Sequence, residues 1–119
     1  MSVTRIEKTS GPGPRMSRCV VHGNTVYVAG LTASDRSAGI KGQTQQILDK
    51  IDGYLATAGT DKSKLLQANL WITDMANFSA MNEVWNAWVD PENPPVRACV
   101  QAGLARPQLL VEIMVSAMK

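Results

Sequence analysis

Six stretches of the chain have the alternating or β-branched composition that is typical of β-strands. Their approximate limits are residues 3–7, 16–22, 25–31, 65–73, 96–102 and 109–117. Two other stretches repeat apolar residues at helical spacing, one from about 42 to 58 and one that begins after Asp74. The resulting order, β-β-β-α-β-α-β-β, predicts an α+β domain in which two helices cover one face of a mixed sheet of about six strands.

Each predicted helix has an apolar stripe and a recognisable end. Gly59 is the expected C-terminal cap of the first helix. Asn77 is a plausible N-cap for the second helix, and the prolines at 91, 94 and 95 prevent its continuation. We interpret both stripes as core packing: Ile47, Leu48, Ile51, Tyr54, Leu55 and Ala58 in the first helix, and Phe78, Met81, Trp85 and Trp88 in the second.

Several residues near the N-terminus are interpreted as structural. Gly23 and Asn24 fit the tight turn of a hairpin between the second and third strands, and His22 beside them is expected to be a solvated turn residue. The Gly- and Pro-rich segment 9–15 is expected to be a loop, because its prolines lack the N–H donors that a phosphate cradle needs. Gly30 interrupts a strand, which favours a place where a ligand or another backbone comes close.

The last two predicted strands each carry one charged residue among apolar neighbours. We expect these strands to be joined as a hairpin by a turn with Gly103 and Pro107. Arg97 shares a strand face with Cys99, and Glu112 stands alone in the second strand. An unpaired buried charge costs several kcal/mol, so each group needs a partner. Spacing alone favours a structural ion pair between Arg97 and Glu112, and the alternative is that the planar Arg97 fork binds a ligand carboxylate.

Two helices cover only one face of such a sheet, and the other face retains large apolar side chains. These are Trp71, Leu110, Met114 and Met118. Exposed apolar patches of more than a few hundred Å2 usually mark an interface. We therefore expect a homo-oligomer whose sheet faces meet, with any ligand site on that face lying between subunits.

The composition excludes several classes of protein. A length of 119 residues with 45% hydrophobic and 18% charged residues predicts a single globular domain over 1–119. No apolar run reaches the roughly 20 residues that span a bilayer, and the charged N-terminus is unlike a signal peptide, so we expect a cytoplasmic protein.

A net charge of +2 without a basic stripe argues against nucleic acid as a partner. Two separated cysteines, Cys19 and Cys99, and one histidine are too few for a metal site.

Motifs that extend over nearly the whole chain resemble those of one known family. The Pro-x-Arg-x-Cys-Val element at 95–100 and Val-Glu-Ile at 111–113 are specific in combination. Further matches are Gly-Asn-Thr-Val-Tyr-Val-Ala-Gly at 23–30, Gln-Thr-Gln-Gln-Ile-Leu at 43–48, Ala-Gly at 58–59, Asp74 to Phe78, and Met-Asn at 81–82. The pattern resembles the RidA/YjgF family, the reactive-intermediate deaminases, which also carry the older names endoribonuclease L-PSP and translation initiation inhibitor.

The resemblance implies a chorismate mutase-like fold and a homotrimer with three sites between subunits. It implies hydrolysis of 2-imino acids and their enamine tautomers, such as 2-aminoacrylate, to 2-oxo acids and ammonia, without a metal or organic cofactor. By the same resemblance, Arg97 holds the substrate carboxylate and the Cys99 backbone N–H assists it. Gly30 lets the ligand approach the main chain, and Glu112 positions or activates the attacking water.

One part of the family pattern is missing. Deaminating members carry a tyrosine early in the chain, and that position falls on Arg15 or Met16 here, neither of which supplies a phenol. Met16 is thus expected to line the changed wall, while Arg15 or Arg18 can reach a second carboxylate of a more acidic substrate. The alternatives to a deaminase are a non-catalytic small-carboxylate-binding module, a chaperone-like trimer and an endoribonuclease. The sequence argues against the endoribonuclease, because it has neither a basic stripe nor a histidine pair.

Overall fold

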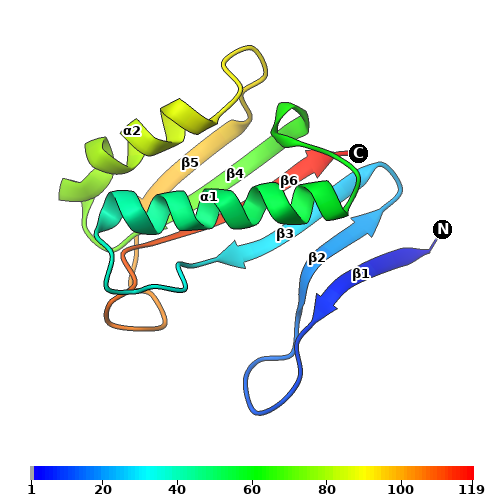
Figure 1. Cartoon of the computed structure of the whole chain (residues 1–119), viewed down its shortest axis with the longest axis horizontal. Coiled ribbons are helices and arrows are strands. Elements are labelled where there is room, and N and C mark those ends of the chain that lie inside the picture. The colour runs from blue at the N-terminus through cyan, green and yellow to red at the C-terminus, as the bar shows by residue number, and fades with distance from the viewer. Residues whose placement is uncertain (1) are drawn as a thin grey trace.

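A six-stranded mixed β-sheet carries two helices on one face in the computed structural model, which describes residues 2–119 (Figure 1). The smallest dimension of the molecule, 20 Å, is that expected of one sheet and one helix layer. The strands are β1 (Val3–Lys8), β2 (Ser17–His22), β3 (Thr25–Leu31), β4 (Leu65–Ile72), β5 (Val96–Gln101) and β6 (Val111–Met118); the helices are α1 (Ile40–Thr57) and α2 (Phe78–Trp88). The predicted element order and the placement of both helices are confirmed.

The spatial order of the strands is β1-β2-β3-β6-β4-β5, so the predicted hairpin of the last two strands is wrong. Strand β4 lies between β5 and β6: β5 is parallel to β4, and β6 is antiparallel to β4 and β3. The physical reason is the crossover through α2, which returns the chain to the start of β4 and places β5 beside it as a parallel edge strand. The segment with Gly103 and Pro107 therefore connects strands that are not neighbours.

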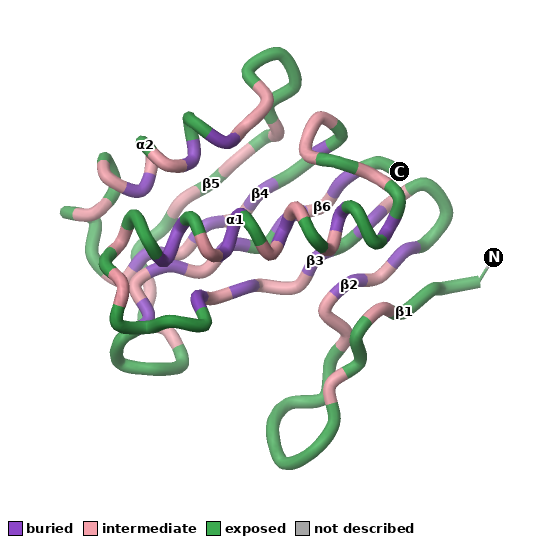
Figure 2. The backbone as a smooth tube through the Cα atoms, viewed as in Figure 1, coloured by how far each residue is buried: buried purple, intermediate pink, exposed green. Residues whose placement is uncertain are grey.

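Alternation along the strands places the hydrophobic core between the sheet and the helices. In β6 the residues at odd positions are buried and those at even positions are half-buried or exposed, as the sequence predicts (Figure 2). The predicted α1 stripe is also buried apart from Tyr54, which packs against the core while partly accessible. Gly59 ends α1 with a φ of 86°, the left-handed conformation expected of a C-terminal glycine.

The start of α2 differs from the prediction in two respects. The Asn77 side chain makes no capping hydrogen bond. Instead Asp74 caps a short 3-10 turn (Met75–Asn77) by accepting a 2.9 Å hydrogen bond from the Ala76 N–H. Phe78 is 37% exposed and is not a core residue, whereas Met81, Trp85 and Trp88 are buried as predicted. The α2 stripe therefore leaves Phe78 accessible beside β5.

The face of the sheet opposite the helices carries several exposed apolar side chains and has no helix over it in the described residues. Val96 is 70% exposed on β5, and Met114 is 41% exposed on β6. Tyr27, Val100 and Met118 are exposed on the same face, and Trp71 and Leu110 are half-buried. Among the described residues, neither helix is long and apolar enough to cross a bilayer.

Candidate functional site

Arg97 lies on the helix-covered face of β5, at the edge of the sheet. It is paired in register with the buried Ala68 of β4, which fixes the direction of its side chain towards α2. Its Nη1 donates a 2.8 Å hydrogen bond to Oδ1 of Asn82. The guanidinium carbon lies 5.4 Å from the centre of the Trp85 ring and 6.0 Å from that of Phe78. Asn82 and two aromatic rings thus hold the guanidinium against α2.

In the described part of the chain, no carboxylate forms an ion pair with this guanidinium. The salt bridge found within residues 2–119 joins Nζ of Lys41 on α1 to Oε2 of Glu83 on α2, 2.5 Å apart on the surface, and does not involve Arg97. Asn82 is a neutral acceptor, and the aromatic rings stabilise a cation by roughly 0.5–2 kcal/mol each without cancelling its charge. A guanidinium has five N–H donors, so most of the Arg97 donors remain available for an anion.

Glu112 lies on the other face of the sheet, paired with Trp71 of β4. Its carboxyl group lies directly over the main chain of Gly30 on β3, where a Cβ atom would overlap Oε2 and come within 3.2 Å of Cδ. Burial raises the pKa of the Glu112 carboxyl above its usual value. A partly buried carboxylate with a raised pKa is suited to accept a proton from water.

The structure therefore overturns the ion pair that spacing favoured. Arg97 faces α2 and Glu112 faces the uncovered side, and β4 separates their strands. Two strand spacings correspond to about 10 Å of backbone separation. Arg97 and Glu112 of a single chain do not contact each other, which leaves the ligand interpretation of Arg97.

Cys99 lies two residues after Arg97, and its thiol points to the same helix-covered face. Burial is the larger influence on this thiol and raises its pKa, which the nearby Arg97 charge only partly offsets. A raised pKa keeps the thiol protonated and argues against a nucleophilic role. Its backbone N–H is a better candidate. The N–H of Ala102 bonds to the Ile72 carbonyl at 3.0 Å, so alternation directs the N–H groups of Arg97 and Cys99 to the free edge of β5.

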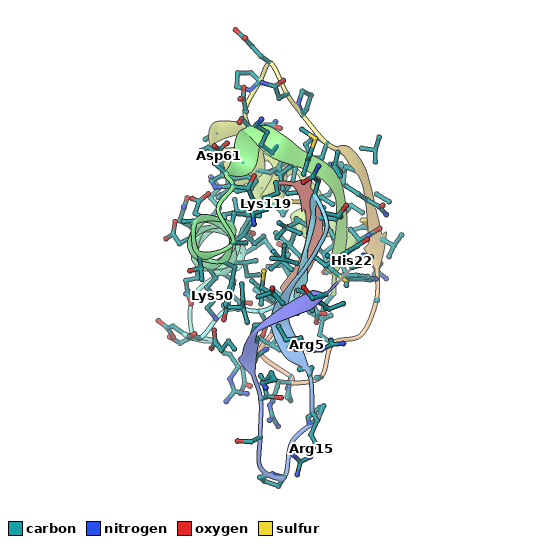
Figure 3. All side chains as sticks on the ribbon, turned by 90° about the vertical axis from the view of Figure 1, so that its right-hand side faces the viewer. Arg5, Arg15, His22, Lys50, Asp61 and Lys119 are labelled. Carbon is teal, nitrogen blue, oxygen red and sulfur yellow. The ribbon has the colours of Figure 1, made fainter. Side chains whose placement is uncertain are left out.

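Met16 lies far from Arg97 in the same chain. It is exposed at the base of the β1–β2 loop, where its N–H donates to Oγ1 of Thr9 at 3.0 Å. Arg15 is at the far end of the molecule (Figure 3). Strands β2 and β5 are four spacings apart, or about 19 Å. A single chain thus carries three separate groups: Met16, the pair Gly30 and Glu112, and the pair Arg97 and Cys99.

The sequence interpretation assigned no role to Asn82 and treated Trp85 and Phe78 only as core residues. These three residues occupy one side of α2, at positions i, i+4 and i+7, and face Arg97. A polar residue inside an otherwise apolar helical stripe is the signal that was available. Its meaning depended on knowing that α2 packs beside β5.

Comparisons with known proteins agree over almost the whole chain. The family model described as endoribonuclease L-PSP matches residues 9–119. A RutC family protein of Haemophilus ducreyi is 41% identical over 115 residues, which cover 97% of this chain and 95% of the relative. The RutC family protein YoaB of Escherichia coli is 38% identical over 117 residues, 98% of each chain.

Solved structures show the same fold. A YjgF family member from Neisseria meningitidis superimposes with a TM-score of 0.91 at 36% identity, covering 100% of this chain and 96% of that one. Because the family model, the relatives and the fold all agree, this chain belongs to the RidA/YjgF family, to which the names RutC and endoribonuclease L-PSP also refer.

Proposed function

We propose that this protein hydrolyses reactive 2-imino acids and their enamine tautomers to 2-oxo acids and ammonia. The observation that carries the proposal is the state of Arg97. Its half-buried guanidinium is held by the neutral Asn82 and by aromatic rings, and it pairs with no carboxylate among residues 2–119. Such a group binds a small carboxylate in bidentate fashion. The Cys99 N–H at the free strand edge adds a second donor for the same anion.

The proposed reaction requires orientation and one proton acceptor. With the substrate carboxylate on Arg97, a water oxygen forms a bond to the carbon of the protonated imine, the C=N π bond breaks, and Glu112 accepts a proton from that water. Glu112 then returns this proton to the nitrogen of the carbinolamine. The C–N bond breaks, ammonia leaves, and the hydroxyl group releases its proton to solvent as the carbon–oxygen double bond of the 2-oxo acid forms. A positioned acid–base group of this kind contributes typically 10²–10⁴-fold to the rate.

The two halves of this site must come from different chains. Arg97 and Cys99 lie at the β5 edge on the helix side, whereas Glu112 and Gly30 lie on the uncovered face. An assembly that covers the exposed Val96, Met114 and Met118 can bring the edge of one subunit to the open face of another. We propose a homotrimer with such sites between its subunits, in which Met16 belongs to the wall contributed by the neighbouring chain.

The proposal is tested by coupling the purified protein to a dehydratase that produces 2-aminoacrylate or its homologue. Added protein is expected to accelerate 2-oxo acid release, and Arg97→Ala is expected to lose at least about 100-fold of that acceleration, because the variant lacks the carboxylate ligand. Arg106→Ala, which changes an exposed arginine in the β5–β6 connection, is the matched control and should retain full activity. No acceleration, or full activity in Arg97→Ala, would contradict the proposal.

The missing tyrosine supports one alternative, a module that binds small carboxylates without turnover. Calorimetry with 2-oxobutyrate distinguishes the two. Binding that depends on Arg97, without acceleration of any imine, selects the binding module. Light scattering at micromolar concentration tests the assembly, since a monomeric mass would exclude a site made of two chains.

A further inference from the structure

A second cleft lies on the helix-covered side of the sheet, away from the face that carries Glu112. It has a volume of about 410 Å3 and is bounded by the β1–β2 hairpin, the segment after β3 and the helix α1. Lys50 belongs to α1 and is labelled in Figure 3. This volume suits a small molecule. The polar wall of the cleft consists of Glu7, Arg18, Thr32, Ser34, Lys50 and Tyr54.

Two cations, Arg18 and Lys50, line this cleft, and within residues 2–119 neither forms a salt bridge. Lys50 is half-buried, and its Nζ donates a 2.7 Å hydrogen bond to the neutral Thr32 carbonyl. Burial lowers the pKa of Lys50, and the positive charge of Arg18 lowers it further. Two cations that repel each other in a partly desolvated cleft favour binding of an anion.

An acceptor stands beside the two cations. The Tyr54 hydroxyl donates a 2.5 Å hydrogen bond to Oε2 of Glu7. Burial and the adjacent Glu7 raise the pKa of Tyr54 to about 12, so the phenol remains a donor at neutral pH. Within residues 2–119, Oε1 of Glu7 receives no hydrogen bond and is available to a ligand.

The backbone conformation of Glu7 indicates that its position is held by surrounding contacts. Glu7 has a φ of 52°, the single non-glycine residue with positive φ in the described chain. A residue with a Cβ atom is disfavoured in this left-handed region and is retained there when surrounding contacts hold it. The Tyr54 hydrogen bond is such a contact and directs the carboxylate along the wall of the cleft.

We propose that this cleft binds a small zwitterionic acid of the α-amino acid class, with its carboxylate on Arg18 and Lys50 and its ammonium group at Glu7. The three residues place two positive charges and one negative charge around one cleft. A ligand with one carboxylate and one ammonium group satisfies the two cations and the free Glu7 oxygen together. The site is separate from Arg97 and Glu112 and does not depend on the proposed deaminase activity.

The test is isothermal calorimetry with three related probes: L-2-aminobutyrate, butyrate and butylamine. Each probe is measured with the full chain and with its Arg97→Ala variant, in which binding of a carboxylate at Arg97 does not contribute. We expect L-2-aminobutyrate to bind, and each probe that lacks one charged group to bind at least about tenfold more weakly. Equal affinity for butyrate and L-2-aminobutyrate would overturn the zwitterion assignment. So would the absence of binding, or binding of inorganic phosphate in preference to the amino acid.

Variants locate the ligand. Arg18→Gln and Lys50→Met, two independent changes, should each weaken L-2-aminobutyrate binding at least about tenfold. Glu7→Gln should lower the affinity for L-2-aminobutyrate towards that for butyrate, and should not weaken butyrate binding, because it removes a negative charge near the carboxylate. Arg106→Gln is the control for removal of an exposed arginine, and a thermal melt checks that each variant folds.

Arg97→Ala separates this inference from the proposed function. The variant should bind L-2-aminobutyrate as the unchanged protein does, even if it has lost all deaminase activity. Loss of binding in Arg97→Ala would place the amino acid at the other site and overturn this inference. Retained binding together with absent deaminase activity would leave this cleft intact and contradict only the proposed function.

Discussion

The carboxyl group of Glu112 occupies the space that a side chain at position 30 would fill. Gly30 on β3 and Glu112 on β6 lie on adjacent antiparallel strands, at a point where the register between Val28 and Leu31 is irregular. The sequence interpretation explained Gly30 by the approach of a ligand or another backbone. The structure shows that the approaching group is the Glu112 side chain itself, so Gly30 determines where this carboxylate lies.

Gly30→Ala should therefore reduce catalysis without removing any chemical group. The new Cβ atom overlaps Oε2 of Glu112 and forces the carboxylate to move. We expect kcat to fall by about 100-fold, within the contribution of a positioned base, and KM to change little because Arg97 is untouched. Steady-state kinetics in the coupled dehydratase assay measures both constants.

Gly53→Ala is the matched control for this substitution. A Cβ atom at Gly53 meets nothing within 4 Å, and the residue lies within α1. Alanine in place of glycine in a helix stabilises by roughly 0.5–1 kcal/mol, so this variant should keep full activity and melt slightly higher. Unchanged kcat in Gly30→Ala would mean that the position of Glu112 is immaterial to turnover.

The raised pKa of Glu112 predicts a pH-dependent cost to stability. A carboxyl whose folded-state pKa lies above its unfolded value binds protons more tightly in the folded state, so its favourable contribution is present at low pH and is lost as pH rises through the folded pKa. Glu112→Gln removes this dependence. At pH 7 the variant should melt higher than the unchanged protein, and the difference should shrink as pH falls through the raised folded-state pKa towards the ordinary carboxyl value of 4.5, below which it should stay constant. Thermal melts from pH 3 to 8 measure it, and a difference that grows on acidification would contradict the assigned cause.

Asn82 should control the anion affinity of Arg97 through its charge. Asn82→Asp keeps the shape of the side chain but places a carboxylate at the end of the 2.8 Å hydrogen bond, which neutralises the guanidinium. We expect 2-oxobutyrate binding to weaken by at least about tenfold in calorimetry. Asn82→Ala keeps the positive charge and loses only the positioning contact, so its loss should be smaller. The reverse ranking would show that geometry, rather than the free charge, governs binding at Arg97.

The sequence predicted local structure well because each prediction depended on short-range periodicity. The alternation in residues 111–118 located the buried face of β6 and identified Glu112 as the residue outside the core. The turn between β2 and β3 was likewise predicted from the Gly23-Asn24 pair alone, and in the structure His22 pairs with Thr25 across that turn. These features require no knowledge of distant parts of the chain.

The strand order and the site could not be obtained in this way. The ion pair between Arg97 and Glu112 assumed that consecutive strands are neighbours, and the insertion of β4 between them removed that contact. The roles of Asn82 and Phe78 depend on how α2 lies against β5, which no periodicity within α2 reveals. Such relationships between distant segments are set by the topology of the crossover, and only the folded chain displays them.

Gln43 should be essential to the stability of the fold, although it belongs neither to the groups around Arg97 and Glu112 nor to the lining of the cleft at Lys50. It is fully buried in α1; its Oε1 accepts from the Leu110 N–H at 2.9 Å, and its Nε2 donates at 2.9 Å to the carbonyls of Ala38 and Gln108. Gln43→Ala leaves these backbone groups without a partner, at about 1–3 kcal/mol for each group that water does not reach. We expect a loss of about 3 kcal/mol in the free energy of unfolding by urea.

Gln45→Ala is the control, because it removes an exposed hydrogen bond to Asp49 on the same helix. It should change the free energy of unfolding by less than about 0.5 kcal/mol. Equal losses in the two variants would mean that the connection before β6 does not depend on Gln43.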